Sequence, residues 1–541
     1  MKNTLEGIHK SIYRYLKNKA NNLEGKPSAQ LLTYQNDQQK SAQRKFSDSN
    51  MQELFSSIED SDIIYLGDFH TFDQSTRNLE RLMRILTSKQ YDFAIGLEFV
   101  HIKNQKYIDY FINNHITELE FLESINYTES WRFPWTYYKK FFEIARKENI
   151  PLLALNTEGT LKSRDQKASR VIANYHKNNP ERKILVLFGE YHIVKNKLPE
   201  KVLRATNKSV IQTIIHQNLD EVYWKLVKDN KLTKDKVVKF TGREFALITS
   251  APWLKYESQI YWYEHLSEDP EFDIHEYIIE TGAINFSDNV PDNFLFICEE
   301  VLRAFRPKVK ERNLDDFHLY DHINLEKVQT HLEKIKNMAL ITFYNNLIKR
   351  GRSFRLPQSN YYFCPNYSIN RVSYLAGVHI HHLALKEKRF RPVDLLTSRK
   401  RSEIFIYFLY QCICGYFASK LINPYRKCDM YADYKKQLRQ NHIKQSRKNS
   451  IKAILALLDN DQPVKENLKG LPLHGIFSSS RKLGHIFADR LFDNYYVKNR
   501  EEIKEALKII YSTDFSDESF FRLKEIVLKD FDYKSSRKRE F

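Results

Sequence analysis

Short runs of apolar residues recur through the first half of the chain, each bounded by polar or turn-forming residues. They lie at residues 62–67, 92–99, 150–156, 183–189 and 209–215, and longer segments with helical spacing separate them. Alternating strands and helices are typical of a parallel sheet. Because the runs are continuously apolar, we expect the strands to be covered on both faces. The pattern predicts an α/β fold with a mainly parallel sheet and flanking helices.

The pattern changes after about residue 225, where the strand signal fades. Residues 244–253 predict an edge strand and a loop, and from about residue 256 the apolar spacing is helical. The polar N-terminal segment predicts a lead helix and then a linker. We therefore predict an N-terminal helix and polar linker at 1–50, an α/β domain at 51–255 and a large, mostly helical domain at 256–541.

Composition and charge narrow the class of protein. The chain has 541 residues, more than one core usually holds, and 42% of them are hydrophobic, as in a globular protein. The net charge of +18 lies mostly in the second half. This charge suits an anionic partner such as a membrane surface or an acidic ligand, and a lysine-rich composition without a specific role explains it equally well. The segment 434–452 is basic, and we interpret it as a solvated face or an anionic contact.

Several features bear on the compartment. The five cysteines are odd in number and lack a CxxC spacing, which favours a reducing environment. Residues 1–22 are basic and amphipathic, without the apolar run of a signal peptide or a following lipobox. Residues 404–422 are about as long as a membrane span but contain Gln411 and Lys420, so we predict a buried helix. We expect a cytoplasmic protein, or one peripheral to a membrane.

Polar side chains follow the expected strands at their carboxyl ends, which is where parallel α/β sheets bind ligands. In chain order these ends carry Asp68 and His70, then Glu98, then Asn156 and Glu158, and then Glu190, Tyr191 and His192. We expect this edge of the sheet to hold the functional site.

Two of the strand ends carry a Gly-x-x-His motif, GDFH at 67–70 and GEYH at 189–192. Glycine lets the chain turn sharply off a buried strand, and the histidine can then point back over the edge of the sheet. The alternative is that these residues only cap the following helices. A functional interpretation leaves three chemistries open, namely metal binding, acid–base hydrolysis and axial ligation of haem iron. The candidate metal ligands are His70, His192, Glu98 and Glu190, and the candidate catalytic residues are His70, His192, Glu98 and Asp68.

Arg164 and Asp165 begin the helix before the fourth strand. Arg164 is a candidate to contact a ligand carboxylate or the carboxylates of the site. The alternative is an ordinary helix N-terminus, at which Asp165 is favourable because of the helix dipole.

Other histidine groups carry weaker signals. His318 and His322 have the i, i+4 spacing of two ligands on one helix face, but the glutamate of a zinc-protease motif is missing. His379, His381 and His382 cannot all point the same way on a helix, so we expect mixed core and surface roles. Trp131, Trp135 and Trp253 are expected to be packing residues, although any of them could form the wall of a flat apolar ligand site.

The motifs GDFH, GLEF, SRDQKAS and GEYH, with the segment IPLLALN, resemble the ChaN-like haem-binding uptake domain of the Tiki superfamily over about residues 55–220. The resemblance implies that His70, Glu98, Arg164 and His192 are site residues. Haem would then be bound by His70, His192, Arg164 and Tyr191. Two departures stand out, since Asp68 replaces the usual glutamate and the lipoprotein signal of many members is missing. The superfamily also contains members that resemble metal-dependent proteases and esterases.

Three hypotheses follow. In the first, the protein binds haem or a related planar, metal-containing ligand at the carboxyl ends of the strands. In the second, it is a hydrolase that uses the two histidines, Glu98 and a divalent metal ion on a small-molecule or peptide substrate. In the third, it is a non-catalytic protein that contacts a membrane or, less favoured, nucleic acid. Whether the protein is an enzyme stays open. The helical half could be a lid, a surface for homodimer formation or a docking module.

Overall fold

The structure is a computed structural model that describes residues 2–232, 236–263, 290–307, 309, 313–321, 323–365, 367–398, 400–440, 443–493 and 502–536. These residues form two compact units. The α/β unit contains the described residues from 10 to 263. The helical unit contains the described residues from 290 onward together with 2–9.

An eight-stranded sheet, in the order β1-β7-β8-β6-β2-β5-β3-β4, organises the α/β unit. Every strand pair from β8 to β4 is parallel, and β7 runs antiparallel to both β8 and β1. The strands are β1 Ser47–Ser49, β2 Ile63–Asp68, β3 Phe93–His101, β4 Leu152–Asn156, β5 Lys183–Gly189, β6 Gln212–Gln217, β7 Lys236–Lys239 and β8 Glu244–Ile248. The predicted fold class, a mainly parallel sheet with flanking helices, is confirmed.

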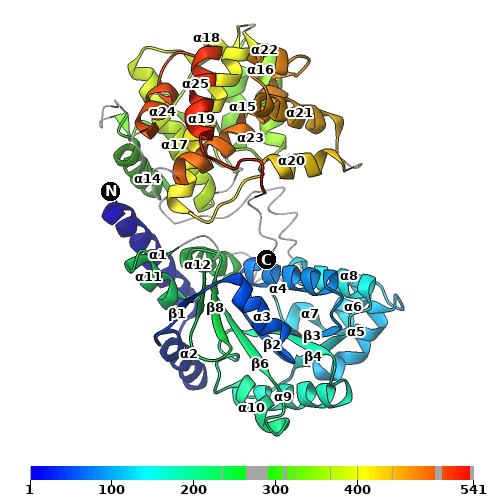
Figure 1. The fold of residues 1–541 in the computed structure, drawn as a ribbon. Coiled ribbons are helices and arrows are strands. Elements are labelled where there is room, and N and C mark those ends of the chain that lie inside the picture. Colours follow the sequence, from blue (N-terminus) through cyan, green and yellow to red (C-terminus); the bar gives the residue numbers. More distant parts are fainter. Residues whose placement is uncertain are drawn as a thin grey trace. The chain divides into compact units, whose positions relative to one another are not determined.

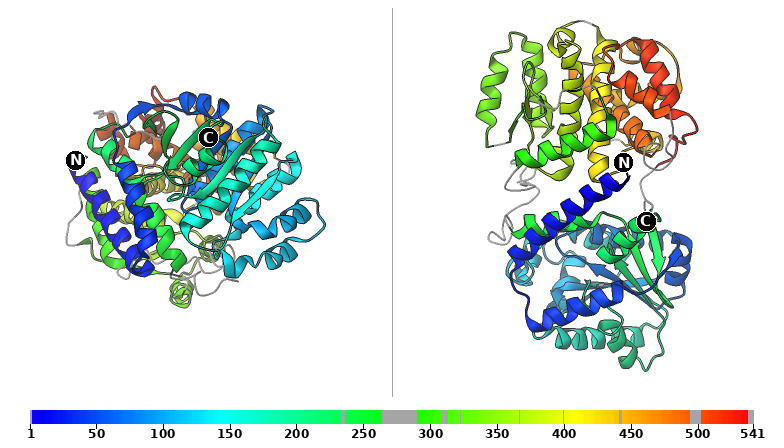
Figure 2. Two further views of the ribbon diagram at one scale, coloured as in Figure 1. Left: turned by 90° about the horizontal axis from the view of Figure 1, so that it is seen from below. Right: turned by 90° about the vertical axis from the view of Figure 1, so that its left-hand side faces the viewer.

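Helices cover both faces of this sheet (Figures 1 and 2). Ile64 and Leu66 of β2 pack on one face with α3, α4 and the helices between β3 and β4. Ile63 and Tyr65 pack on the other face with α9 and α10. Successive side chains of a strand point to opposite faces, so burial on both sides requires the continuous apolar runs seen in the sequence. The helices are α1 Lys2–Glu24, α2 Ala29–Ala42, α3 Met51–Glu59, α4 Asp73–Ser88, α5 Gln105–Ile112, α6 Glu118–Ser124, α7 Tyr127–Ser130, α8 Lys139–Glu148, α9 Leu161–Asn178, α10 Leu198–Ala205, α11 Asp220–Lys228 and α12 Pro252–Tyr261.

Two local predictions for this unit were wrong. Part of the expected linker is the helix α2, whose buried residues are only Tyr34 and Ala42. Polar contacts hold the helix and the residues after it in place, including Lys197 with Asp37 and Arg44 with Glu244, so no apolar stripe marks it in the sequence. The expected edge strand, β8, has β7 on its outer side, and β7 escaped notice because only Val237 and Val238 are apolar in it.

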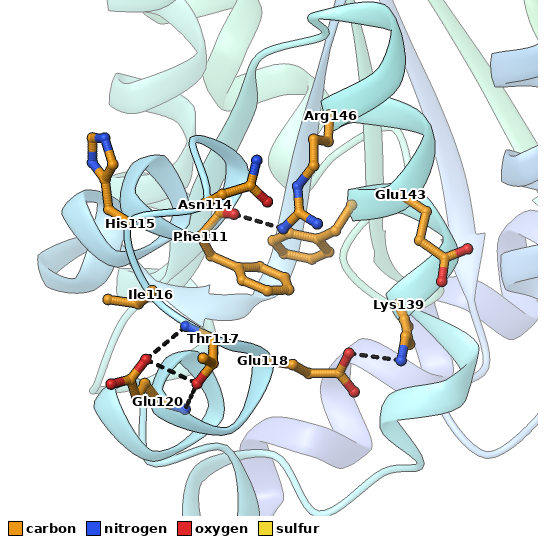
Figure 3. A pocket seen from close by; sticks show the side chains of 11 residues that line it. Phe111, Asn114, His115, Ile116, Thr117, Glu118, Glu120, Lys139, Glu143 and Arg146 are labelled. Carbon is orange, nitrogen blue, oxygen red and sulfur yellow. Dashed lines mark hydrogen bonds and ion pairs between the residues drawn. The ribbon is translucent and has the colours of Figure 1, made fainter.

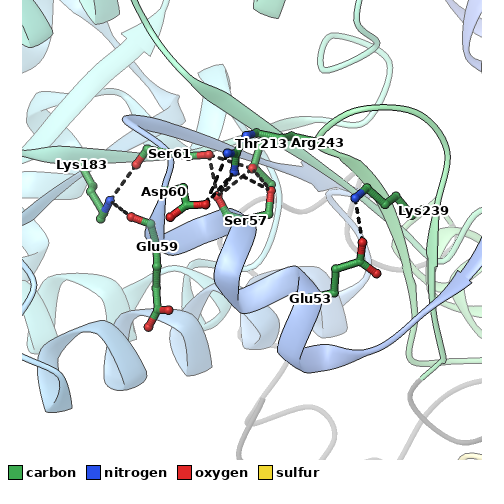
Figure 4. Close-up of polar contacts among 9 residues, drawn as sticks. All are labelled: Glu53, Ser57, Glu59, Asp60, Ser61, Lys183, Thr213, Lys239 and Arg243. Atoms are coloured by element: carbon green, nitrogen blue, oxygen red, sulfur yellow. Dashed lines mark hydrogen bonds and ion pairs between the residues drawn. The ribbon is translucent and has the colours of Figure 1, made fainter.

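A polar network lies at the amino ends of the strands, away from the predicted site (Figure 4). Lys183 Nζ, at the start of β5, donates to the carbonyl oxygens of Glu59 and Ser61 at 2.6 and 2.9 Å. Arg243 donates to the Ser57 carbonyl at 3.3 Å and pairs with Asp60. These cations satisfy carbonyl groups at the C-terminus of α3, where the helix dipole favours positive charge. We assign this network a structural role.

The helical unit is built around α19, which packs against α17 and α23. Its helices are α14 Val290–Phe305, α15 Leu325–Glu333, α16 Met338–Lys349, α17 Ile369–Glu387, α18 Pro392–Leu396, α19 Arg401–Ile422, α20 Tyr431–Leu438, α21 Gln445–Asp459, α22 Val464–Asn467, α23 Leu473–Phe492, α24 Glu502–Ile510 and α25 Asp517–Leu528. A three-stranded sheet accompanies them, formed by β9 His318–Tyr320, β10 Phe354–Arg355 and β11 Tyr361–Phe363.

Helix α19 is the one helix among the described residues that is long and apolar enough to cross a membrane, with a mean hydropathy of 1.3 over its most apolar window. That window is entirely buried inside the unit, in agreement with the predicted buried helix. The buried Lys420 in α19 pairs with the buried Asp489 of α23, which explains a charge in this apolar segment. Glycine permits the close crossing of α17 and α19, since a Cβ at Gly377 would lie 2.3 Å from the Cys414 carbonyl oxygen.

The buried carboxylate of Glu244 binds the segment after α2 to the sheet through Arg44. Its ionisation makes the stability of the fold depend on pH. Glu244 is 4% exposed; Arg44 donates to it, and its Oε1 lies 2.9 Å from His216 Nε2. Burial by itself would raise the pKa of Glu244, but these partners lower it to about 2. The ionised carboxylate therefore stabilises the fold above pH 4.5, and this stabilisation is lost as the pH falls toward 2.

We predict that Glu244→Gln lowers the free energy of unfolding by roughly 2–3 kcal/mol at pH 7. Calorimetry should show that this difference from the wild type shrinks between pH 5 and pH 2.5, the range set by the lowered pKa. The control is Glu53→Gln, because Glu53 pairs with Lys239 on the surface and such pairs contribute about 0–1 kcal/mol. A difference for Glu244→Gln that stays constant with pH would contradict this account.

Candidate functional site

The strand ends singled out by the sequence are neighbours in the sheet, in the order β2-β5-β3-β4. Asp68 at the end of β2 lies opposite Gly189 at the end of β5. The two Gly-x-x-His motifs therefore begin side by side. A cavity of about 880 Å³ opens at this edge, and all the predicted site residues line it, namely Asp68, His70, Glu98, Arg164, Glu190, Tyr191 and His192. Their chemical roles stay predictions.

His70 is oriented by the carboxylate two residues before it. Its Nδ1 lies 2.9 Å from Asp68 Oδ2, which also accepts a hydrogen bond from the hydroxyl of Tyr138 at 3.2 Å. The ring packs against Trp131 and Phe133, with centroids 4.6 and 5.0 Å away. The shorter side chain of Asp68, in place of the usual glutamate, thus still reaches the imidazole. The His70 side chain keeps 26% of its surface exposed toward the cavity.

Glu98 joins three elements at the end of β3. Its Oε1 lies 2.6 Å from Arg164 Nη2 of α9, and its Oε2 accepts a hydrogen bond from the backbone N–H of Gly189. His70 Nε2 lies 3.8 Å from the same Oε2. Burial would raise the pKa of Glu98, but the charges of Arg164 and the two histidines lower it below its usual value. Of the two interpretations of Arg164, the structure therefore shows the contact with a site carboxylate.

The motif glycines allow close packing at the strand ends, and the chain turns directly after Gly189, where the N–H of His192 donates to the Gly189 carbonyl oxygen at 2.8 Å. A Cβ at Gly189 would lie 3.2 Å from Glu98 Oε2 and 3.3 Å from His70 Nε2. At Gly67 it would lie 3.1 Å from Ile193 Cδ1. Neither glycine has a positive φ angle. A side chain at Gly189 would push the carboxylate and the imidazole away from the backbone, so glycine at this position lets Glu98 bind the strand directly.

His192 also has a carboxylate partner, Asp165. From the sequence, Asp165 was a candidate for an ordinary residue at a helix N-terminus. His192 Nδ1 is hydrogen-bonded to Asp165, and Asp165 is fully buried rather than exposed at the start of α9. Tyr34 and Lys201 also donate to Asp165, at 2.7 and 2.9 Å. Burial alone would raise the pKa of Asp165, but the hydrogen bonds from His192, Lys201 and Tyr34 lower it. Tyr34 and Lys201 lie on α2 and α10, and no motif marks either residue.

The predicted metal ligands do not form one compact group. Among the residues that the structure describes, no three His, Cys, Asp or Glu side chains are grouped so that they could hold a metal ion. His70, His192, Glu98 and Glu190 all line one cavity, and their role in binding a metal ion stays a prediction. Separate carboxylates orient the two histidines through Nδ1, and Glu98 is bound by Arg164 and the N–H of Gly189.

Another wall of the cavity carries a buried ion pair that sequence reasoning missed. Lys255 is 5% exposed, and its Nζ lies 2.8 Å from Asp220 Oδ1. Burial lowers the pKa of Lys255, but the negative charges of Asp220 and Glu190 outweigh it and raise the pKa. Tyr256 and Tyr13 also donate to Asp220, at 2.6 and 2.7 Å. Lys255, in the helix α12, is therefore held as a cation at the cavity.

A smaller cavity of about 390 Å³ lies among α5, α6 and α8 (Figure 3). Several of its polar side chains have partners within the protein. Thr117 and Glu120 form the capping box of α6, Lys139 pairs with Glu118 at 2.6 Å, and Arg146 donates to the Phe111 carbonyl at 2.6 Å. These contacts stabilise helix ends and side-chain packing, so we assign no ligand to this cavity.

The structure contradicts the predictions for two further groups of histidines. His318 lies on the strand β9 rather than on a helix, and His322 lies outside the described residues. His379, His381 and His382 are all buried, so the expected surface role for part of this group was wrong. Each ring is hydrogen-bonded to a different oxygen. The partner of His379 is the Tyr362 hydroxyl, that of His381 is the Ile510 carbonyl, and that of His382 is the Asn360 side-chain amide oxygen.

Comparison with known proteins agrees with the resemblance found in the motifs. Residues 54–164 match the family described as "Haem-binding uptake, Tiki superfamily, ChaN". The resemblance of this part of the chain to the ChaN-like family is thereby confirmed. A solved structure, "Cofacial heme binding to ChaN of Campylobacter jejuni", is similar at 18% identity with a TM-score of 0.25, over 36% of this chain and 94% of that chain. Among curated proteins, none matches this sequence significantly.

The electrostatics of His70 lead to a prediction for the ligand-free protein. Burial lowers the pKa of His70, but the hydrogen bond to Asp68 and the charges of Asp68 and Glu98 outweigh it and raise the pKa above 6.5. The stabilisation from protonated His70 is complete below pH 6.5 and is lost as the pH rises through the folded-state pKa. NMR titration of the imidazole resonances should show this raised pKa.

Glu98→Gln should lower the pKa of His70, because it removes a negative charge and leaves the positive charge of Arg164 uncompensated. The control is Glu158→Gln at the rim of the same cavity, where the Glu158 side chain is 82% exposed and its charge is screened. A His70 pKa that is the same in the wild type and Glu98→Gln would show that this carboxylate does not act on the imidazole.

Proposed function

We propose that the α/β unit binds haem or a related planar, metal-containing ligand at the carboxyl ends of β2, β3 and β5, with His70 as the residue that faces the metal. One observation carries the proposal. Asp68 occupies Nδ1 of His70, which lines the cavity, and Nε2 makes no hydrogen bond among the described residues, its nearest carboxylate oxygen being Glu98 Oε2 at 3.8 Å. A histidine that ligates a metal through one nitrogen usually donates the other N–H to a carboxylate or carbonyl group. This arrangement also suits axial ligation of haem iron.

The walls of the cavity fit a flat, largely apolar molecule. Trp131 and Phe133 border His70, and Trp262 stacks in a tilted arrangement on Phe133 with centroids 4.9 Å apart. Aromatic faces bind planar rings through offset or edge contacts. The cavity volume of about 880 Å³ lies within the range of roughly 300–1,000 Å³ that is typical of small-molecule and cofactor sites.

The cations at the cavity suit the acidic groups of such a ligand. Lys17, Arg164 and Lys255 all line it, and each already contacts one carboxylate of the protein. A ligand carboxylate would therefore join an existing ion pair rather than meet an isolated charge. The bound group would supply the metal chemistry, while the protein residues bind and orient it and the aromatic walls exclude water.

We predict that haemin titrated into the purified protein gives a saturable shift of the Soret band. His70→Gln should abolish the shift or weaken binding at least about tenfold, because the ligating nitrogen is lost. Asp68→Asn should weaken binding by a smaller factor, because it loosens the orientation of the imidazole. His115→Gln is the matched control, since His115 lines the separate cavity of Figure 3. The proposal fails if haemin gives no saturable shift, or if His70→Gln binds as the wild type does.

Hydrolysis is a second candidate function, favoured by the pair His192 and Asp165. A carboxylate on Nδ1 orients an imidazole so that Nε2 can act as a general base, as in many hydrolases. Asp165 is itself held by Tyr34 and Lys201, so the orientation of His192 is strongly constrained. This pair requires no metal ion to position it.

If the second function is correct, hydrolysis of a simple activated ester should depend on His192 and much less on His70. His192→Gln should lower kcat/KM by roughly 100-fold or more, and Asp165→Asn should lower it by a smaller factor. His176→Gln is the control, because His176 lies on the same helix as Asp165 but does not line the cavity. Equal rates in the wild type and His192→Gln would exclude His192 as the base.

A further inference from the structure

Positive side chains of the helical unit gather around two adjoining cavities, of about 290 and 210 Å³, that share Arg352, Phe477 and Arg481. The cations come from separate parts of the chain: the segment after α16, the start of α17, the segment after α19, the start of α21, and α23. They are Arg350, Arg352, Arg371, Arg426, Arg447, Arg481 and Lys482. Among the lining residues, Asp429 is the one carboxylate. We call this group the basic cluster.

The basic cluster is not neutralised by the protein. Within the described residues, the side chains of Arg352 and Arg481 form neither a hydrogen bond nor an ion pair. Other cations of the cluster bind neutral oxygens. Arg371 donates to the Gly351 carbonyl at 2.8 Å, and Lys482 donates to Ser478 Oγ at 2.6 Å. The buried cations Lys420 and Lys255, by contrast, each have a carboxylate partner.

Mutual repulsion within the basic cluster is evident from its electrostatics. The charge of Arg481, followed by burial and the charge of Arg371, lowers the pKa of Arg352 to about 10. Burial and the charges of Arg447 and Arg481 lower the pKa of Lys482 to about 8. Several like charges around one solvent-accessible cavity raise its positive potential, which favours a bound anion.

Helix termini add to the positive potential. Asn370 and Arg371, in the first turn of α17, line the smaller cavity, and Ser446 and Arg447, in the first turn of α21, line the larger one. Neither first turn contains an acidic residue, and neither helix has a side-chain N-cap hydrogen bond. The dipole at such helix ends favours anions, phosphate above all.

We propose that the basic cluster binds a small molecule that carries a phosphate ester or diphosphate, with Arg352 and Arg481 contacting its phosphate oxygens. The planar guanidinium group pairs with phosphate through two parallel hydrogen bonds, which suits two arginines without protein partners. Phe477 and Tyr434 offer aromatic surface, and Ser450 and Ser478 offer hydroxyl groups, for the remainder of the molecule.

The shape of the basic cluster favours a small molecule over a polymer or a membrane. The cations converge on concave cavities from separate segments, whereas a nucleic-acid backbone or a lipid surface is usually met by an open basic stripe. The larger cavity, about 290 Å³, is at the small end of the range for ligand sites. This inference does not depend on the function proposed for the α/β unit.

The test uses the full chain with pyrophosphate as the probe, measured by calorimetric titration at constant ionic strength. We expect saturable binding with one site and a rise in the Tm of the protein. Arg352→Gln and Arg481→Gln should each weaken binding about tenfold or more, since each removes a charge-assisted contact. Arg391→Gln is the matched control, because Arg391 is exposed and lines neither cavity. Its Nε lies 3.6 Å from Asp394 Oδ2.

A second measurement separates binding from folding. Without pyrophosphate, Arg481→Gln should keep or raise the Tm, because it relieves repulsion on Arg352. Arg352→Lys, which keeps the charge but loses the planar fork, should bind more weakly than the wild type and more tightly than Arg352→Gln. The proposal is overturned if pyrophosphate shows no saturable binding, or if both glutamine variants, correctly folded by circular dichroism, bind it as tightly as the wild type.

Competition experiments identify the source of the phosphate group. Pyrophosphate should displace a fluorescent phosphate ester from the wild type. The same protein is then tested with phosphatidylglycerol vesicles and with single-stranded DNA. If either binds more tightly than pyrophosphate, and pyrophosphate does not reduce that binding, the small-molecule proposal is overturned in favour of an extended anionic surface.

Discussion

Glu98 carries a buried negative charge at the end of β3, and the candidate site depends on how that charge is satisfied. Arg164 reaches it from α9, the N–H of Gly189 from β5, and His70 from the segment after β2. Leaving such a carboxylate without partners would be very costly, so the three elements are held in a fixed arrangement around it. The protein's own charges thereby connect three elements at this edge of the sheet.

Both histidines of the site are oriented by carboxylates, but by different routes. His70 uses Asp68, two residues away in the sequence, whereas His192 uses Asp165 from α9, which Tyr34 and Lys201 hold in turn. Both pairs place a defined nitrogen at one cavity, and among the described residues no three ligands meet at one point. The haem-type ligand proposed above would bring its own metal to this cavity.

The two units differ in whether their charged side chains have partners of opposite charge. In the α/β unit, buried charges such as Glu98, Asp165 and Asp220 have partners of the other sign. In the helical unit, Lys420 follows the same rule, but the basic cluster does not. An unneutralised group of arginines costs stability, and proteins commonly retain such costs where a ligand removes them.

Local patterns in the chain were enough for the parallel sheet and for the position of the site. A continuous apolar run must be covered on both faces, and polar residues at the ends of adjacent parallel strands must meet at one edge, so the positions of Asp68, Glu98 and His192 in the chain already assign them to that edge. The helix α2 and the pairing of His192 with Asp165 could not be predicted, because they rest on polar contacts between residues more than 25 positions apart. The same holds for the basic cluster, whose arginines come together only when the helices pack. Sequence spacing records which faces are apolar, whereas the partner of a buried charge is decided by the tertiary fold.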